Sequence, residues 1–116
     1  MSKFHNRNVE IDGIKFDSLA EGRYYEVLKL RQKAGDIERF EVHPKIMLVP
    51  AFVSSDGEKV RAITIIPEFC VMKLGKTIFA DCKGGKATQT IAWRIKWKLL
   101  KWAYRDMKNY EFEIVE

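Results

Sequence analysis

The stretch from Ile65 to Gly85 reads IIPEFCVMKLGKTIFADCKGG and decides how the rest of the chain is interpreted. It holds two apolar runs separated by Leu74 and Gly75, a pattern typical of a two-residue β-hairpin loop. Counting outward from that loop along both strands sets Glu68 directly opposite Asp81. Carboxylates opposed across a strand pair repel each other, so we expect a compensating cation nearby.

Lys83 follows Asp81 by two positions and therefore projects from the same face of its strand. One explanation is a structural salt-bridge network, in which Lys83 neutralises Glu68 and Asp81. The other is a divalent-metal site, because two carboxylates plus waters suit Mg²⁺ and a neighbouring lysine orients water or stabilises charge on a phosphate. The residues alone leave both explanations open.

The opposite face of the same hairpin is predicted to be core. Its alternate positions carry apolar or small side chains, namely Phe69, Val71, Ile78, Ala80 and Cys82. Cys82 and Cys70 form no C-x-x-C pair, and no zinc-ligand spacing with histidine is present, so we expect both thiols to be reduced.

A helix is predicted before this hairpin. Ser18 and Glu21 have the spacing of a capping box, and Gly35 marks the expected end of the helix. The expected apolar stripe consists of Ala20, Tyr24, Val27 and Leu28. The capping box is by itself a sufficient structural reason for an acid at position 21.

A second helix of about 18 residues is predicted after the hairpin, starting near Thr88 or Gln89. Its expected apolar side consists of Ile91, Ile95, Leu99 and Trp102. Short strand patterns occur within residues 9–18, 37–53 and 60–73, and the later two are broken near the prolines. The tail 110–115 alternates strictly. This order predicts one domain over residues 1–116 with an α/β (α+β) fold, a central mixed β-sheet flanked by helices.

Positive charge is concentrated after the hairpin. Residues 83–108 hold eight basic residues against one acid, a local balance of +7, whereas the whole chain carries +5. On the second predicted helix, one face carries Arg94, Lys98, Lys101 and Arg105. Such a stripe is either a solvated helix face or a track for a nucleic-acid backbone. Further phosphate contacts are expected from Lys86 and from a possible flexible basic arm, residues 1–10, through Lys3, His5 and Arg7.

Composition excludes several classes of protein. No run approaches the roughly 20 apolar residues that cross a bilayer, and the first ten residues have no apolar segment of a signal peptide. We therefore expect no membrane partner and a cytoplasmic location. The tryptophans Trp93, Trp97 and Trp102 are assigned to packing, in the core or at a subunit interface.

The sequence PEF at residues 67–69, followed by DCK at residues 81–83, resembles the motif of the PD-(D/E)XK nuclease superfamily. The chain is similar, over nearly all of its 116 residues, to small phage-encoded members related to Holliday-junction resolvases. The resemblance implies a restriction-endonuclease-like core. It also implies that Mg²⁺ (or Mn²⁺) is held by Glu68, Asp81, Glu21 and the main-chain carbonyl of Cys82, with Lys83 as the catalytic lysine. The superfamily usually has Asp where this chain has Glu68.

These expectations combine into a function. The resemblance implies a metal-dependent endonuclease that hydrolyses phosphodiesters of branched double-stranded DNA, a four-way junction above all. Because two opposed strands must be cut, a homodimer with two identical sites is expected. The alternatives are a non-catalytic DNA-binding protein on the same scaffold, and a nuclease for flaps or ends.

Overall fold

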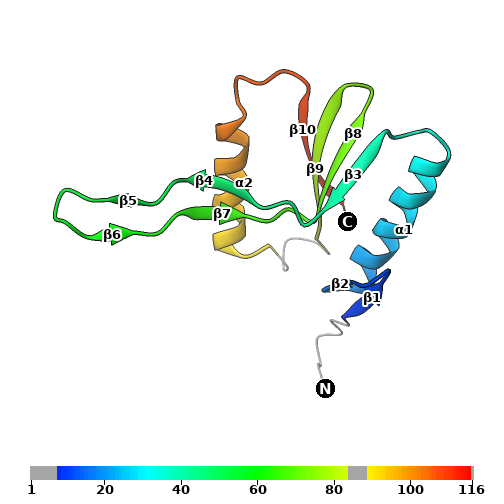
Figure 1. The fold of residues 1–116 in the computed structure, drawn as a ribbon, viewed down its shortest axis with the longest axis horizontal. Helices are drawn as coiled ribbons and strands as arrows, with labels where there is room; N and C mark the ends of the chain where they lie inside the picture. The colour runs from blue at the N-terminus through cyan, green and yellow to red at the C-terminus, as the bar shows by residue number, and fades with distance from the viewer. Residues whose placement is uncertain (1–7, 84–88, 116) are drawn as a thin grey trace.

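A four-stranded mixed sheet forms the centre of the molecule (Figure 1). The structure is a computed structural model and describes residues 8–83 and 89–115. The strand order is β10-β9-β8-β3; β10 is parallel to β9, and the other neighbours are antiparallel. The strands are β3 (Arg39–Val42), β8 (Phe69–Lys73), β9 (Lys76–Cys82) and β10 (Tyr110–Val115). The predicted mixed sheet of an α+β fold is confirmed.

The hairpin of β8 and β9 has the predicted register. Lys73 pairs with Lys76 and Phe69 pairs with Ala80. Leu74 and Gly75 both have positive φ, 52° and 78°, as a type I′ turn requires. The register is therefore regular from the turn to the residues that adjoin Glu68 and Asp81.

Helix α1 (Leu19–Lys33) covers one face of the sheet. Ser18 caps it by accepting a hydrogen bond from the Glu21 amide, and Gly35, with φ of 82°, follows the last turn. The core on this face contains Phe16, Tyr25, Leu28, Ile37, Phe69, Val71 and Ala80.

The predicted apolar stripe of α1 is confirmed only in part: Leu28 is buried and Tyr24 packs against the core, whereas Ala20 and Val27 are exposed. Val27 is 45% exposed, and the buried side of the helix instead follows Glu21, Tyr25 and Leu28. The reason is a small ribbon, β1 (Val9–Ile11) and β2 (Ile14–Phe16), that packs on the start of α1. Gly22 permits this approach, because a Cβ there would lie 2.8 Å from Val9 Cγ2. Packing of this ribbon on the start of α1 buries the side of the helix that carries Glu21.

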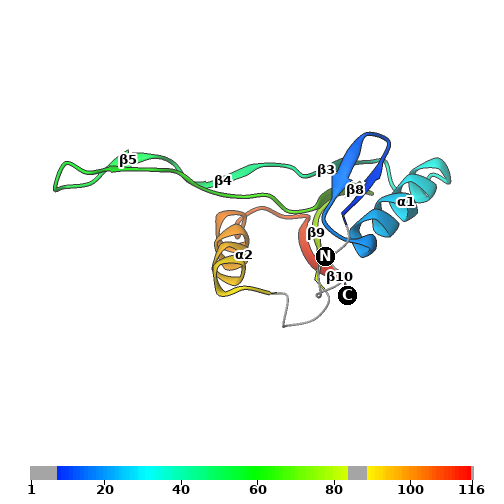
Figure 2. The same cartoon turned by 90° about the horizontal axis from the view of Figure 1, so that it is seen from below.

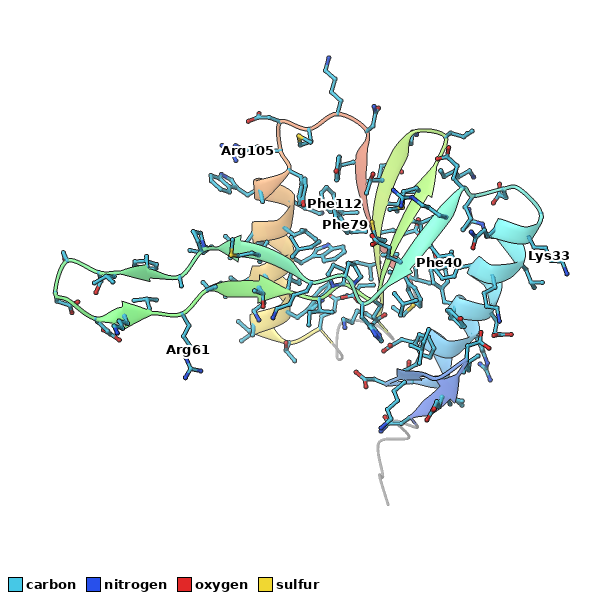
Figure 3. All side chains as sticks on the ribbon, in the orientation of Figure 1. Lys33, Phe40, Arg61, Phe79, Arg105 and Phe112 are labelled. Atoms are coloured by element: carbon cyan, nitrogen blue, oxygen red, sulfur yellow. The ribbon has the colours of Figure 1, made fainter. Side chains whose placement is uncertain are left out.

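Helix α2 (Ile91–Ala103) covers the opposite face of the sheet, where Phe79 stacks on Phe112 (Figure 3). Thr90 caps it by accepting from the Trp93 amide at 3.0 Å. The core on this face contains Ile65, Cys70, Phe79, Trp97 and Leu100.

The predicted apolar side of α2 is also wrong, and the helix is shorter than predicted. Ile91, Ile95 and Trp102 are 69%, 54% and 60% exposed, whereas Trp97 and Leu100 are buried. The helix is apolar on two sides, so periodicity alone does not distinguish the side that meets the sheet from the side that meets solvent.

A long β-ribbon, which we call the arm (residues 46–65), crosses α2 and projects beyond it (Figures 1 and 2). Its strands are β4 (Ile46–Val49), β5 (Phe52–Val53), β6 (Lys59–Val60) and β7 (Ile63–Ile65). Near the sheet, β4 pairs with β7 and both contact α2; farther out, β5 pairs with β6. The breaks fall beside Pro44, Pro50 and Pro67, as predicted, but the projecting arm was not predicted. None of the helices that the structure describes is long and apolar enough to span a membrane.

Candidate functional site

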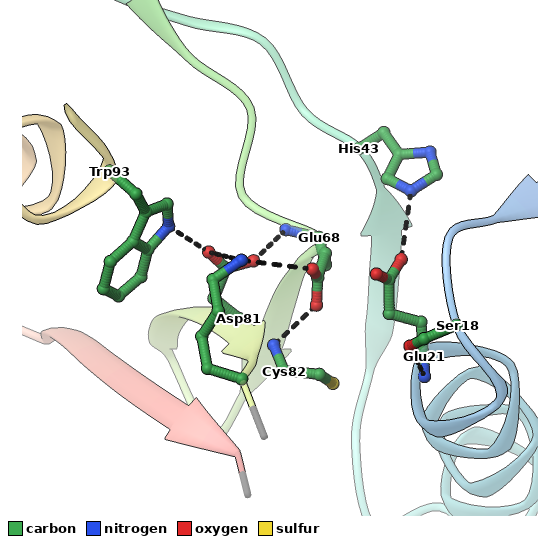
Figure 4. A network of polar contacts seen from close by, with 8 residues as sticks. Ser18, Glu21, His43, Glu68, Asp81, Cys82 and Trp93 are labelled. Atoms are coloured by element: carbon green, nitrogen blue, oxygen red, sulfur yellow. Dashed lines mark hydrogen bonds and ion pairs between the residues drawn. The ribbon is translucent and has the colours of Figure 1, made fainter. Parts of the chain in front are cut away.

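Two acids lie buried where β8 begins and β9 ends, with Asp81 2% and Glu68 8% exposed. The Glu68 amide donates to Asp81 Oδ1 at 3.1 Å, and the Cys82 amide donates to Glu68 Oε1 at 2.5 Å (Figure 4). Each carboxylate therefore accepts a hydrogen bond from the backbone of the opposite strand. This reciprocal arrangement fixes both acids on rigid elements, as the predicted register requires.

Lys83 lies between the two acids. Its Nζ is 3.8 Å from Glu68 Oε2 and 3.6 Å from Asp81 Oδ2, and its side chain is only 18% exposed. The prediction that these three side chains lie together is confirmed. One ammonium between two carboxylates leaves the group with a net negative charge if both acids are ionised.

Burial of the two acids side by side shifts the pKa values of groups in the site. Burial, and then the Asp81 charge, raise the pKa of Glu68 to about 9, although the Cys82 amide and Lys83 act against the shift. Without a further cation, Glu68 is therefore protonated at neutral pH. Burial and the same acids raise the pKa of the Cys82 thiol, so Cys82 carries no thiolate and is not a nucleophile.

Glu21 enters the site from the first turn of α1. Its backbone amide donates to the Ser18 hydroxyl at the cap, its side chain is 6% exposed, and Oε1 has no hydrogen-bond partner among the residues that the structure describes. The ring of His43 faces this carboxyl group, with Nε2 4.0 Å from Glu21 Oε1. Burial raises the pKa of Glu21, and the neighbouring Glu68 carboxyl lowers it. The cap contact joins the Ser18 hydroxyl to the Glu21 amide, so it does not use the Glu21 carboxylate.

Trp93 belongs to the site, although sequence reasoning assigned it to packing. Its indole Nε1 donates to Asp81 Oδ2 at 2.5 Å, and Lys83 Nζ lies 5.1 Å from the centre of its ring. Trp93 thus holds one acid by a hydrogen bond and the lysine by a cation–π contact. The signal available in the sequence was its place three residues after the cap at Thr90, which fixes the first turn of α2 beside the end of β9.

His43 is the second residue that sequence reasoning missed. It directly follows β3 and has a φ of 54°, an uncommon value for a residue other than glycine, and its amide donates to the Glu68 carbonyl at 2.8 Å. The ring rests against Phe16, with centroids 5.7 Å apart, and faces Glu21. No spacing in the sequence reveals this placement, because it depends on the pairing of β3 with β8.

The basic residues predicted to contact DNA separate into two groups. Arg94, which follows Trp93, begins an exposed row along α2 that continues with Lys98 and Lys101, and exposed Arg105 follows just after the helix ends. Arg105 stacks on Trp102, 3.9 Å from the ring centre. The other predicted contacts lie outside the described residues: Lys3, His5, Arg7 and Lys86.

The donor set fits a hard divalent cation. Carboxylate oxygens are the ligands that Mg²⁺ prefers, the two hairpin acids repel each other, and Glu21 Oε1 is buried without a partner. Over residues 8–83 and 89–115, however, no three His, Cys, Asp or Glu side chains already form a ready-made metal site. The oxygens of Asp81 are held by Glu68 and Trp93 instead. Metal binding through Glu68, Asp81, Glu21 and the Cys82 carbonyl therefore stays a prediction.

Comparison with known proteins gives a family without an assigned activity. No curated protein and no solved structure matches the chain. One family, described as "Protein of unknown function (DUF1064)", matches residues 1–113, which is almost the whole chain. The chain therefore belongs to the DUF1064 family.

Proposed function

We propose that this chain is a Mg²⁺- or Mn²⁺-dependent endonuclease that cuts branched double-stranded DNA, four-way junctions above all, on a PD-(D/E)XK-like core. The observation that carries the proposal is the buried group of Glu68, Asp81 and Lys83 at one end of the β8–β9 hairpin. Two acids and one lysine on rigid strands are the parts that metal-assisted phosphodiester hydrolysis needs. We place this activity in the cytoplasm.

The residues divide the work by position. When bound, a divalent cation supplies Lewis-acid activation of water and neutralises charge on the phosphate. Glu68 and Asp81 would hold that cation, and Glu21 would approach it from α1 with its unpartnered oxygen. Lys83, 3.6 Å from Asp81, brings a fixed positive charge to the place where a phosphate would develop negative charge.

The substrate class follows from the exposed basic row of α2. Arg94 begins this row next to Trp93, so the row starts at the site and continues away from it along the helix. Arg and Lys in such a row contact phosphates and carry no base readout, which suits an enzyme that recognises DNA shape.

A second candidate function is DNA binding without cutting. It is favoured by the hydrogen bonds that already occupy Asp81 and by the raised pKa of Glu68, which together describe a closed, satisfied group. Glu68 in place of the usual Asp supports the same view, because its longer side chain reaches the Cys82 amide.

One experiment separates these functions. Purified protein is incubated with a labelled four-way junction, a matched linear duplex and a flap, each in Mg²⁺, Mn²⁺ or EDTA. The proposal expects nicks near the branch point that need the metal and are absent from linear duplex. Binding without nicks in every metal supports the second candidate, and preferential cutting of flaps replaces the junction as substrate.

A further inference from the structure

Helix α2 carries a second apolar face that nothing in the described chain covers. Counting about 100° per residue, this face lies roughly opposite the side that packs on the sheet through Trp97 and Leu100. We call it the outer face of α2, and it consists of Ile91, Ile95, Leu99 and Trp102. Three of the four are more than half exposed. A helix apolar on two opposite sides is typical of a helix that packs against two partners.

The arm presents a second uncovered surface on the same flank of the molecule. Its outer strands β5 and β6 pack on each other and on no other described element to a comparable extent, and Phe52 and Val53 are 48% and 64% exposed. A two-stranded ribbon alone is marginally stable in water. From Ile46 to Asp56 the ribbon spans about 33 Å, whereas a helix is about 10–12 Å wide, so much of the arm extends past α2 (Figures 1 and 2).

We propose that the outer face of α2 is the interface of a two-fold homodimer, in which α2 packs antiparallel against α2 of a second copy beside the projecting arms.

The spacing of the outer face favours a second copy as the occupant. Its apolar positions follow steps of four, four and three residues, and reversing the helix gives three, four and four. An antiparallel copy therefore offers apolar side chains opposite apolar side chains, as a self-complementary two-fold interface requires. Trp102, stacked under Arg105, supplies the residue types that dominate interface energies.

The area available also agrees with a dimer. A standard interface removes roughly 800 Å² from each partner, more than one short helix face supplies. The arm adds what α2 lacks, because seven of the fourteen exposed large hydrophobic residues of the described chain lie on the arm and on α2. In the proposed dimer, the part of the arm that projects past α2 supplies this further contact area (Figures 1 and 2).

Charge explains the antiparallel direction. The basic row occupies the flank of α2 between its buried side and its outer face. A two-fold axis perpendicular to both helices turns one onto the other and keeps this flank facing the same way, so two basic rows form one surface. A parallel pair would place the rows on opposite sides. A single basic surface would suit a two-fold DNA junction, and this part of the argument rests on the proposed function.

The test is the mass of the full chain in solution, measured by sedimentation equilibrium from about 1 to about 100 μM, the range of weak to standard interfaces. The proposal expects twice the 13.6 kDa chain mass for the parent protein. It expects the monomer mass for the double variant Ile91→Ser, Ile95→Ser and for Trp102→Ser. The matched control is Val27→Ser, Leu30→Ser on α1, whose targets are 45% and 67% exposed and which should stay dimeric.

The outcomes are separable from those of the nuclease assay, because the mass is measured without DNA. Circular dichroism checks that each variant is folded. We expect folding to be retained because the substituted side chains are exposed. A parent chain that stays monomeric at every concentration overturns the proposal. So does a parent dimer that both α2 variants leave intact. A dimer that dissociates only in a third variant, Phe52→Ser, Val53→Ser on the arm, also overturns it. On a supercoiled cruciform plasmid, a folded monomeric variant should give nicked circles where the parent gives linear product. If the parent is dimeric but cuts nothing, the interface stands and the nuclease function fails.

Discussion

The indole of Trp93 donates a hydrogen bond of 2.5 Å to Asp81 Oδ2, and thereby ties the first turn of α2 to the acid at the end of β9. This contact makes the position of the buried acid depend on a helix that begins ten residues after it. The same ring lies beside Lys83, so a single side chain orients two members of the group. Residues of this kind set the geometry of a metal ligand without touching the metal.

Trp93→Phe tests this relationship. The change keeps an aromatic ring at position 93 but removes the indole N–H that donates to Asp81. Loss of a hydrogen-bond partner of a metal ligand typically lowers metal affinity or activity about 10- to 100-fold. We expect weaker Mn²⁺ binding by calorimetry and slower nicking, with the fold retained. The control is Trp97→Phe, because Trp97 Nε1 is buried without a hydrogen-bond partner and its removal breaks no such bond. Equal effects of both changes would show that Trp93 acts only through packing.

The pKa of Glu68 predicts an unusual dependence of stability on pH. Its folded-state pKa is about 9, above the ordinary value of 4.5, so the folded state binds a proton that the unfolded state releases. The contribution of Glu68 to stability is therefore fully present below pH 4.5 and is lost as the pH rises toward 9. We expect the melting temperature of the protein in EDTA to fall between pH 6 and pH 9.

Two additions sharpen that measurement. Glu68→Gln removes the titrating group and should flatten the slope, while Mg²⁺ should restore stability at high pH by stabilising the carboxylate form. A slope that is identical in the parent and in Glu68→Gln would contradict the assignment of the titration to Glu68.

The length of the side chain at position 68 is a separate prediction. Glu68 reaches the Cys82 amide, and Asp, one methylene shorter, would leave that buried N–H without its partner. A buried donor left unsatisfied costs about 1–3 kcal/mol. We expect Glu68→Asp to lower the free energy of unfolding in urea by that amount, while Glu68→Gln, which keeps the length, changes it less. Equal stability of Glu68→Asp and the parent would show that the hydrogen bond from the Cys82 amide to Glu68 does not contribute to the free energy of unfolding.

Glu21 is predicted to oppose stability in the absence of metal. Its carboxylate is buried with one oxygen unpartnered, and its pKa is raised by burial, so Glu21→Gln should raise the melting temperature in EDTA while it slows metal-dependent nicking. Glu26→Gln on the same helix is the matched control, since Glu26 is exposed and makes only a surface pair with Lys29. A Glu21→Gln variant that is less stable and cuts normally would assign Glu21 to structure alone.

The features that sequence reasoning predicted correctly are those set by local spacing. A two-residue loop fixes the register of β8 and β9, and this register alone brings Glu68, Asp81 and Lys83 together. The cap at Ser18 is local in the same sense.

The features that it missed depend on tertiary contacts. The burial of Glu21 follows from the approach of the β1–β2 ribbon to Gly22, which no periodicity encodes. The side of α2 that meets the sheet is ambiguous because both sides are apolar. His43 comes to the site through the pairing of β3 with β8, and the base of the arm forms because β4 pairs with β7, more than ten residues later in the chain.

The central claim is that Lys83 and the two hairpin acids form a catalytic group, and the single-turnover rate of junction nicking in Mg²⁺ tests it most directly. Lys83→Ala is compared with Lys76→Ala, which removes a lysine from the other end of β9, where it makes an exposed pair with Glu111. Loss of a catalytic charge typically costs about 10²- to 10³-fold in rate. We predict such a loss for Lys83→Ala and a parent-like rate for Lys76→Ala. Equal nicking by Lys83→Ala and the parent, or no nicking by the parent in either Mg²⁺ or Mn²⁺, would contradict the claim.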